Sequence, residues 1–332
     1  MVNQKDVAKL AKVSTATVSA VINKNKFVSE HLENRVNEAI EAIGYKPNLV
    51  ARSLKLNQTK SIGVILVDIE NLFFVKMIRR IEELARAKDY NIVLCVTEND
   101  PIREREYIEV LKGKLVDGYI IIPSSSNLKV SYEILKEDKL VFIDRFPHDS
   151  AETSITVNNY QSTFNAMDYL ISQGHKKIAF FAIPLDTTTG FERFRGYKEY
   201  LLKNNLYFNE ELVKHVDYSI EDAYEKTKEL LNSNNKPTVL FSSGIMTSIG
   251  ILKYLIKNNI KVPEDMSFIG FDELFDFTEL LSFKPTLIKQ PVYKIAELAM
   301  DLILSKITGE NVKKNKYILK TEFLIGDSVK KL

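Results

Sequence analysis

The stretch NQKDVAKLAKVSTATVSAVIN, residues 3–23, predicts two short helices joined by a tight turn. Asn3 can cap the first helix, with Asp6 three residues later as the reciprocal partner of a capping box. Ser14 can cap the second helix. The outward positions of that second helix carry small side chains, which let a helix approach the major groove of DNA closely. These positions are Thr15, Ala16, Thr17, Ser19 and Ala20.

A helical hairpin with no role in DNA binding is the alternative, because helix-turn-helix patterns also arise by chance. The sequence that follows favours the DNA-binding interpretation. A third helix is expected over residues 30–43, with Ser29 as its cap and Gly44 as its stop. Three helices of this length can bury one shared core.

Charge is distributed unevenly along the chain. Residues 1–60 contain ten Lys and Arg against five Asp and Glu, a net charge of +5. The whole chain has a net charge of +2, so the remaining residues carry −3. A basic module joined to a mildly acidic body is typical of an electrostatic DNA footprint confined to one end of a protein. A solvated basic linker is the alternative explanation of this charge.

The composition disfavours several classes of protein. Cys95 is the single cysteine, which excludes a disulfide within the chain and suits a reducing cytoplasm. We find no signal peptide and no apolar run of the roughly 18–20 residues that a membrane span needs. The sequence also lacks common phosphate-binding, nucleophile-elbow and metalloprotease motifs, and its four histidines lie far apart. We therefore expect a cytoplasmic protein that is not an enzyme and needs no cofactor or metal.

From Ser61 onward, short apolar runs alternate with amphipathic segments. This rhythm predicts two α/β lobes, each built on a doubly wound parallel sheet. The expected strands are 62–67, 91–96, 118–122, 140–143, 177–183, 238–242 and 266–271. The expected helices are 74–88, 102–113, 128–138, 160–173, 191–204, 220–233, 246–259 and 291–307, followed by an edge-like segment over 316–325.

Ligands of open α/β sheets lie outside the carboxyl ends of the strands, so the residues just after the strands are the candidate binding residues. They mix carboxylates, arginines, small polar groups and aromatic rings, a set that suits a polyhydroxy ligand. Helix caps and solvated loops are the alternative explanation for any one of them. The candidates are Asn71, Phe73, Phe74, Ser124, Asp144, Arg145, Arg193, Gly244 and Asp272.

The chain resembles transcription regulators of the lactose-repressor (LacI/GalR) family. The resemblance runs in family order from end to end and rests on short stretches that include KDVA (5–8), VSTATVS (13–19), GYKPN (44–48), ARSL (51–54), VDG (116–118), RFRGY (193–197) and GFDE (270–273). It implies a small all-α helix-turn-helix head on a two-lobed, periplasmic-binding-protein-like core. It also implies a homodimer whose heads enter successive major grooves of a palindromic operator.

The resemblance divides the chain into a DNA-binding domain over 1–46, a hinge helix and linker over 47–60, and a core over 61–332. The expected lobes are approximately 61–159 plus 291–321, and 160–290 plus 322–332. The hinge would fold on the operator, with Leu54 wedged into the minor groove. The implied DNA-binding residues are Ser14, Thr15, Ala16, Thr17, Ser19, Ala20, Asn23, Tyr45, Asn48, Arg52, Leu54 and Lys55.

The sequence departs from the family pattern in three places. Lys12 stands in the turn where the family commonly has glycine, and Ala20 stands where many members have an arginine that reads guanine. We therefore expect an operator half-site that differs from the commonest family pattern. Gly244-Ile245 replaces an Asn-Asp pair that is frequent in sugar-binding members. Arg193, with Arg145 near it, could instead pair with a carboxylate or phosphate.

The sequence thus predicts a repressor of carbohydrate-utilisation genes, controlled by a sugar, sugar acid or sugar phosphate bound between the lobes. Some members of the family respond instead to a phosphorylated partner protein, and the sequence leaves that alternative open. A sugar-binding transport protein would share the two-lobed core, but the basic three-helix head would then have no purpose.

Overall fold

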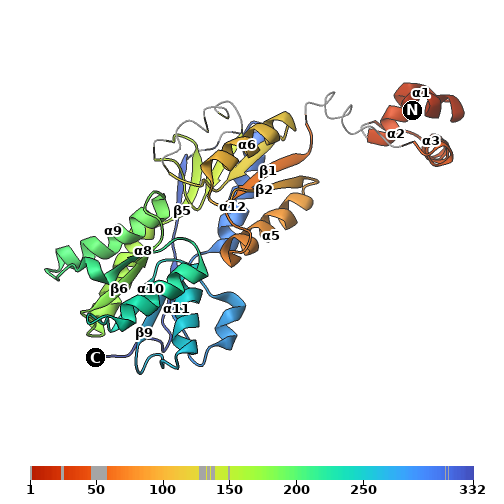
Figure 1. Ribbon diagram of the computed structural model, residues 1–332. Helices are drawn as coiled ribbons and strands as arrows, with labels where there is room; N and C mark the ends of the chain where they lie inside the picture. Colours follow the sequence, from red (N-terminus) through yellow and green to blue (C-terminus); the bar gives the residue numbers. More distant parts are fainter. Residues whose placement is uncertain are drawn as a thin grey trace. The chain divides into compact units, whose positions relative to one another are not determined.

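The structure is a computed structural model with two compact units, residues 1–59 and 60–332, which are described separately (Figure 1). It describes residues 2–23, 26–45, 58–126, 132, 135, 139–148, 150–310, 312 and 314–332. None of the helices in these ranges is long and apolar enough to cross a membrane.

The first unit contains the predicted helices: α1 (Gln4–Leu10), α2 (Thr15–Asn23) and α3 (Glu30–Ile43). The capping box of α1 is formed, with the Asn3 side chain accepting from Asp6 N and the Asp6 side chain accepting from Asn3 N. Ser14 Oγ accepts from the backbone N–H of Thr17 at 3.0 Å and caps α2. The core of this unit comprises Val7, Ala8, Ala11, Val18, Val21, Val36, Ala39 and Tyr45.

Left-handed backbone closes two of these helices. Gly44 ends α3 with φ 62°, as the sequence predicts. Lys12 has φ 51° in the turn between α1 and α2, at the position where the family commonly has glycine. Ser29 stands at the N-cap of α3, but among the described residues its side chain makes no capping hydrogen bond.

The second unit is built on two sheets. The first has the order β11-β5-β4-β3-β1-β2 with all neighbouring strands parallel. Its strands are β1 (Ser61–Leu66), β2 (Asn91–Val96), β3 (Gly118–Ile121), β4 (Leu140–Ile143), β5 (Thr153–Val157) and β11 (Lys316–Leu319). The second has the order β12-β10-β9-β8-β6-β7 and is parallel except for β12. Its strands are β6 (Ile178–Ala182), β7 (Val213–His215), β8 (Val239–Ser242), β9 (Ser267–Phe271), β10 (Thr286–Lys289) and β12 (Glu322–Leu324).

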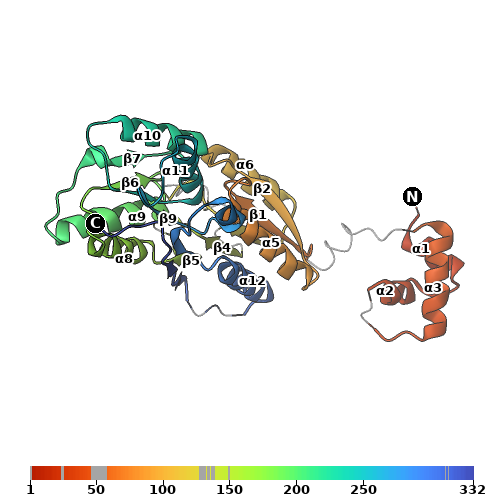
Figure 2. The same ribbon diagram turned by 90° about the horizontal axis from the view of Figure 1, so that it is seen from below.

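Helices cover the faces of both sheets in side-by-side pairs (Figures 1 and 2). α5 (Leu72–Arg86) lies beside α12 (Val292–Thr308), and α6 (Pro101–Gly113) also packs on the first sheet. On the second sheet α8 pairs with α9, and α10 with α11. Their bounds are α8 (Asn159–Ser172), α9 (Thr188–Lys203), α10 (Ile220–Asn232) and α11 (Ile245–Lys257), with 3₁₀ turns at η2 (Glu210–Leu212) and η3 (Phe275–Leu280).

Within the described residues the chain crosses between the lobes after β5, after β10 and after β11. The sequence prediction missed β5, β7 and β10, and it was wrong to treat 316–325 as one segment. That segment holds two strands that belong to different sheets, β11 and β12. Helix α9 begins at Thr188, earlier than predicted, because Thr187 Oγ1 caps it by accepting from Gly190 N. The helix predicted over 128–138 lies mostly outside the described residues.

Candidate effector cleft and DNA-binding surface

Two aspartates occupy equivalent places in the two lobes. Asp144 follows β4 and Asp272 follows β9, each with left-handed backbone at φ 66° and 79°. Each donates its backbone N–H to the neighbouring strand, Asp144 to Ile155 O and Asp272 to Ile288 O, both at 2.9 Å. These two hydrogen bonds hold both carboxylates at the carboxyl ends of the strands, where the sequence predicts the ligand site.

Arg193 on α9 is buried between the aspartates and is held by several groups. Its Nε donates to Asn159 Oδ1 at 2.8 Å, and its Nη1 donates to Ser243 O at 2.6 Å. Nη1 also lies 3.9 Å from Asp272 Oδ2, and the guanidinium stacks 3.6 Å above the ring of Phe271. The orientation of this cation is therefore fixed by the protein itself.

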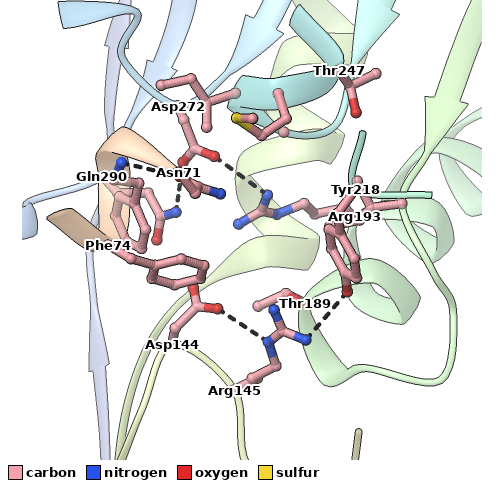
Figure 3. A pocket seen from close by; sticks show the side chains of 15 residues that line it. Asn71, Phe74, Asp144, Arg145, Thr189, Arg193, Tyr218, Thr247, Asp272 and Gln290 are labelled. Carbon is pink, nitrogen blue, oxygen red and sulfur yellow. Dashed lines mark hydrogen bonds and ion pairs between the residues drawn. The ribbon is translucent and has the colours of Figure 1, made fainter. Parts of the chain in front are cut away.

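Arg145 reaches from the first lobe toward the second (Figure 3). Its Nε lies 3.6 Å from Asp144 Oδ2, too far for a hydrogen bond, and Nη1 donates to Tyr218 Oη at 3.2 Å. The guanidinium also lies 5.2 Å from the centre of the Tyr218 ring. Nε is buried and, among the described residues, has no hydrogen-bond partner.

The charges of this cleft balance within the described residues. Burial raises the pKa of both Asp144 and Asp272, while neighbouring guanidiniums partly oppose the rise. Burial likewise lowers the pKa of Arg193, and the two carboxylates oppose that fall. Two carboxylates thus face Arg145 and Arg193 in loose ion pairs with no net charge.

The remaining walls come from helix N-termini and strand ends. Asn71 caps α5 by accepting from Phe73 N at 3.0 Å, and this turn presents the Phe74 ring to the cleft (Figure 3). Gln290 Nε2 donates to Asp272 Oδ1 at 2.6 Å. The cleft encloses a cavity of about 40 Å³. It is lined by Asn71, Phe73, Phe74, Asp144, Arg145, Ile183, Thr189, Arg193, Tyr218, Gly244, Ile245, Met246, Thr247, Asp272 and Gln290.

The structure brings together every predicted effector residue except Ser124. Ser124 lies behind the cleft, where its backbone N–H and its hydroxyl donate to Glu104 Oε2 at 2.5 and 2.6 Å. Glu104 is itself fully buried and also accepts from Tyr132. Burial raises the pKa of Glu104, so the serine and tyrosine donors partly stabilise a carboxylate that has left water. Ser124 is therefore corrected from a lining residue to a partner of this buried acid.

The sequence prediction missed Tyr218 and Gln290, although both obey the strand-end rule. Tyr218 lies shortly after β7, and Gln290 lies directly after β10. Neither strand was recognised, so the residues that follow it were not considered. Among the described residues, no group of His, Cys, Asp and Glu is arranged to hold a metal ion.

The DNA-binding candidates divide into three groups. Ser14, Thr15 and Ala16 are exposed at the start of α2, while Thr17 and Ser19 are half-buried. Ala20 and Tyr45 are only 8% exposed each, so the expectation that Ala20 points outward is wrong, and Tyr45 belongs to the helical core. The side chain of Asn23, and all of Asn48, Arg52, Leu54 and Lys55, lie outside the described residues.

Comparison with known proteins agrees with this architecture. Residues 4–48 match the family described as bacterial regulatory proteins, lacI family, and residues 167–329 match a periplasmic binding protein-like domain. The regulator RegA of Clostridium saccharobutylicum is 33% identical over 98% of both chains. The repressor PurR of Histophilus somni is 33% identical over the whole of both chains. The Lac repressor dimer bound to operator and the anti-inducer ONPF shares the fold, with a TM-score of 0.87 over 99% of both chains at 22% identity.

These relatives are transcriptional regulators and not enzymes. Repressors of this kind bind DNA operators and small-molecule effectors and act as dimers. Because full-length relatives match at this identity, the chain belongs to the lacI family of bacterial regulatory proteins and is a DNA-binding transcriptional repressor.

Proposed function

We propose that this repressor controls carbohydrate-utilisation genes and that a small sugar-like effector bound in the cleft regulates it. The observation that carries the proposal is the pair of loose carboxylate–guanidinium contacts, 3.6 Å at Asp144–Arg145 and 3.9 Å at Asp272–Arg193. A sugar hydroxyl can donate to the carboxylate and accept from the guanidinium at the same time. Phe74 and Tyr218 add aromatic faces on which a sugar ring can stack.

The charge balance of the cleft favours a neutral effector. An anionic sugar acid or sugar phosphate would add negative charge beside Asp144 and Asp272, and Arg193 is already bonded to Asn159 and Ser243. Arg145, whose buried Nε lacks a hydrogen-bond acceptor among the described residues, is the group that could still receive an anion. The experiment that tests the effector must therefore compare neutral sugars with anionic ones.

Binding would also move the lobes. A sugar in the cleft would contact Phe74 and Asp144 of the first lobe and Arg193 and Asp272 of the second, so its binding can change the relative orientation of the lobes. We propose that this movement is transmitted to a hinge over 47–60 and changes the grip of the 1–46 domain on a palindromic operator. The core over 61–332 would form the homodimer, with lobes of approximately 61–159 plus 291–321 and 160–290 plus 322–332. Effector and operator would then affect each other's affinity reciprocally.

Thermal unfolding of the full chain with a ligand panel tests the effector. The panel pairs neutral sugars with their sugar acids and sugar phosphates, and adds purine bases, because a flat heterocycle would also stack on Phe74. A ligand at 100 times its dissociation constant should add about 2.7 kcal/mol to the free energy of unfolding. Arg193→Gln should abolish that gain, whereas the exposed control Arg79→Gln should keep it. Stabilisation by purine bases alone would contradict a sugar effector. A panel in which no carbohydrate stabilises the protein would contradict it as well.

A further inference from the structure

A continuous chain of hydrogen bonds joins the two charged halves of the cleft behind its wall. Arg193 Nε, in the second lobe, donates to Asn159 Oδ1 at 2.8 Å. Asn159 Nδ2 in turn approaches Thr156 Oγ1 at 3.5 Å and donates to Val157 O at 3.3 Å. Thr156 Oγ1 donates to the backbone carbonyl of Asp144, in the first lobe, at 2.9 Å. Along this series of hydrogen bonds, Asn159 and Thr156 each accept from the group nearer Arg193 and donate to the group nearer Asp144.

The middle of this chain lies on a lobe crossover. Asn159 is the first residue of α8 and comes two residues after the end of β5, so it stands where the polypeptide leaves the first sheet for the second lobe. Its side chain is 5% exposed and bonded on both ends, which fixes the orientation of the amide. The amide thus contacts both lobes, Arg193 on α9 of the second and Thr156 and Val157 on β5 of the first.

At a second crossover another side-chain amide holds a charged group of the cleft, but there the amide donates the hydrogen bond instead of accepting it. Gln290 directly follows β10, where the chain returns toward α12 and the first lobe. Its Nε2 donates to Asp272 Oδ1 at 2.6 Å, and its side chain is 4% exposed (Figure 3). Arg193 and Asp272 are thus each held by an amide that belongs to a crossover segment.

We propose that Asn159 is a positioning residue that orients Arg193 for the effector and couples it, through Thr156, to Asp144 across the crossover. The proposal rests on the effector cleft described above, but the hydrogen bonds that carry it do not depend on which ligand binds there. Asn159 acts through Arg193, whose Nε–H it holds. Movement of the lobes therefore changes the positions of the Arg193 guanidinium and the Asp144 backbone together.

Hydrogen exchange of the Arg193 Nε–H, followed by NMR on the full-length protein without added ligand, tests this directly. The resonance is assigned by its disappearance in Arg193→Lys. Asn159→Ala should make this proton exchange about tenfold faster, because its acceptor is lost. Asn159→Asp keeps an acceptor for Arg193 but loses the amide donor to Thr156 and Val157, so its exchange rate should lie between those of the wild type and Asn159→Ala. Asn165→Ala, which removes an exposed amide from the same helix, should leave the exchange rate unchanged.

Thr156→Val tests whether Thr156 couples Arg193 to Asp144, separately from the direct contact between Asn159 and Arg193. Valine has the shape of threonine but neither accepts from Asn159 nor donates to Asp144. The Arg193 Nε–H should exchange faster in this variant, although its hydrogen bond is to Asn159 and not to residue 156. Unchanged exchange in Thr156→Val would overturn the coupling, and unchanged exchange in Asn159→Ala would overturn the positioning role. If Asn159→Ala does not fold, Asn159→Leu, which also lacks the acceptor but keeps a side chain of similar size, takes its place in the test of positioning. Because no effector is present, failure of the sugar panel leaves these outcomes readable.

Discussion

At the scale of single residues, burial raises the pKa of both cleft carboxyl groups. These two groups therefore make the folded protein more stable at lower pH. The pKa values of Asp144 and Asp272 are raised above the ordinary aspartate value near 3.9, so the folded state binds protons more tightly than the unfolded state. The free energy of unfolding should therefore fall as pH rises through the window between the ordinary and the raised pKa.

Asp144→Asn and Asp272→Asn should each remove part of this pH dependence, because an amide does not titrate. Urea unfolding between about pH 4 and 7 measures the effect as a shallower fall of the free energy of unfolding in each variant. Asp301→Asn, on the exposed face of α12, is the control and should keep the wild-type slope. Slopes equal to wild type in both cleft variants would show that these carboxylates have ordinary pKa values.

Lys12 is a second residue whose backbone predicts a measurable effect. With φ at 51°, the Lys12 backbone is strained by its Cβ, whereas glycine adopts this conformation freely. Lys12→Gly should therefore stabilise the helical unit by about 1 kcal/mol. Hydrogen exchange of α1 and α2 amides in the full chain reports the local free energy. Lys9→Gly, the same replacement within α1, should destabilise this unit by a similar amount. Two changes of the same sign would refute the strain argument.

At the scale of elements, the capping box of α1 should make a measurable contribution because the helix is short. Asn3 Oδ1 accepts from the backbone N–H groups of Lys5 and Asp6, at 2.8 and 3.3 Å. Asn3→Ala leaves these donors to water and should cost about 1 kcal/mol, seen as faster exchange in α1. Asn3→Ser, which keeps an accepting oxygen, should recover most of the loss. Equal losses in the two variants would show that the cap is not the cause.

Elements with strong local signals were predictable from the sequence, and those defined by their neighbours were not. Helix α3 was predicted with its observed bounds because an apolar face and a stopping glycine mark it. Strand β7 has three residues, and β10 has the sequence TLIK, so neither carries a hydrophobic run that identifies it alone. Both strands are defined by pairing with β6 and β9.

The candidate site follows the same division. Most of its residues were found because they follow strands that the sequence revealed, Asp144 after β4 and Asp272 after β9. The partners that hold them were not predictable, because the contact between Arg193 and Asn159 joins residues that are far apart in the sequence. Ser124 satisfied the same strand-end rule, yet a buried glutamate on α6 removes it from the cleft.

At the scale of the whole molecule, the separation of charge between the two units predicts how the repressor binds DNA. The net charge of +5 over residues 1–60 contrasts with −3 over the rest. Phosphate contacts release counterions, so the logarithm of the binding constant should fall linearly with the logarithm of salt concentration, by about 0.9 for each phosphate neutralised. Titration of the full chain with a mixed-sequence duplex between about 50 and 200 mM salt gives this slope.

Two matched double variants locate the footprint. Lys5→Gln/Lys26→Gln removes exposed charge from the helical unit, and Lys176→Gln/Lys257→Gln removes the same charge from the core. The first should reduce the steepness of the slope by about one for each lysine that contacts a phosphate, while the second should leave it unchanged. Both proteins have the same net charge, so a difference between them reports location and not total charge. Equal slopes in the two variants would mean that the core shares the DNA contact, and the helical unit would then not be the sole electrostatic footprint.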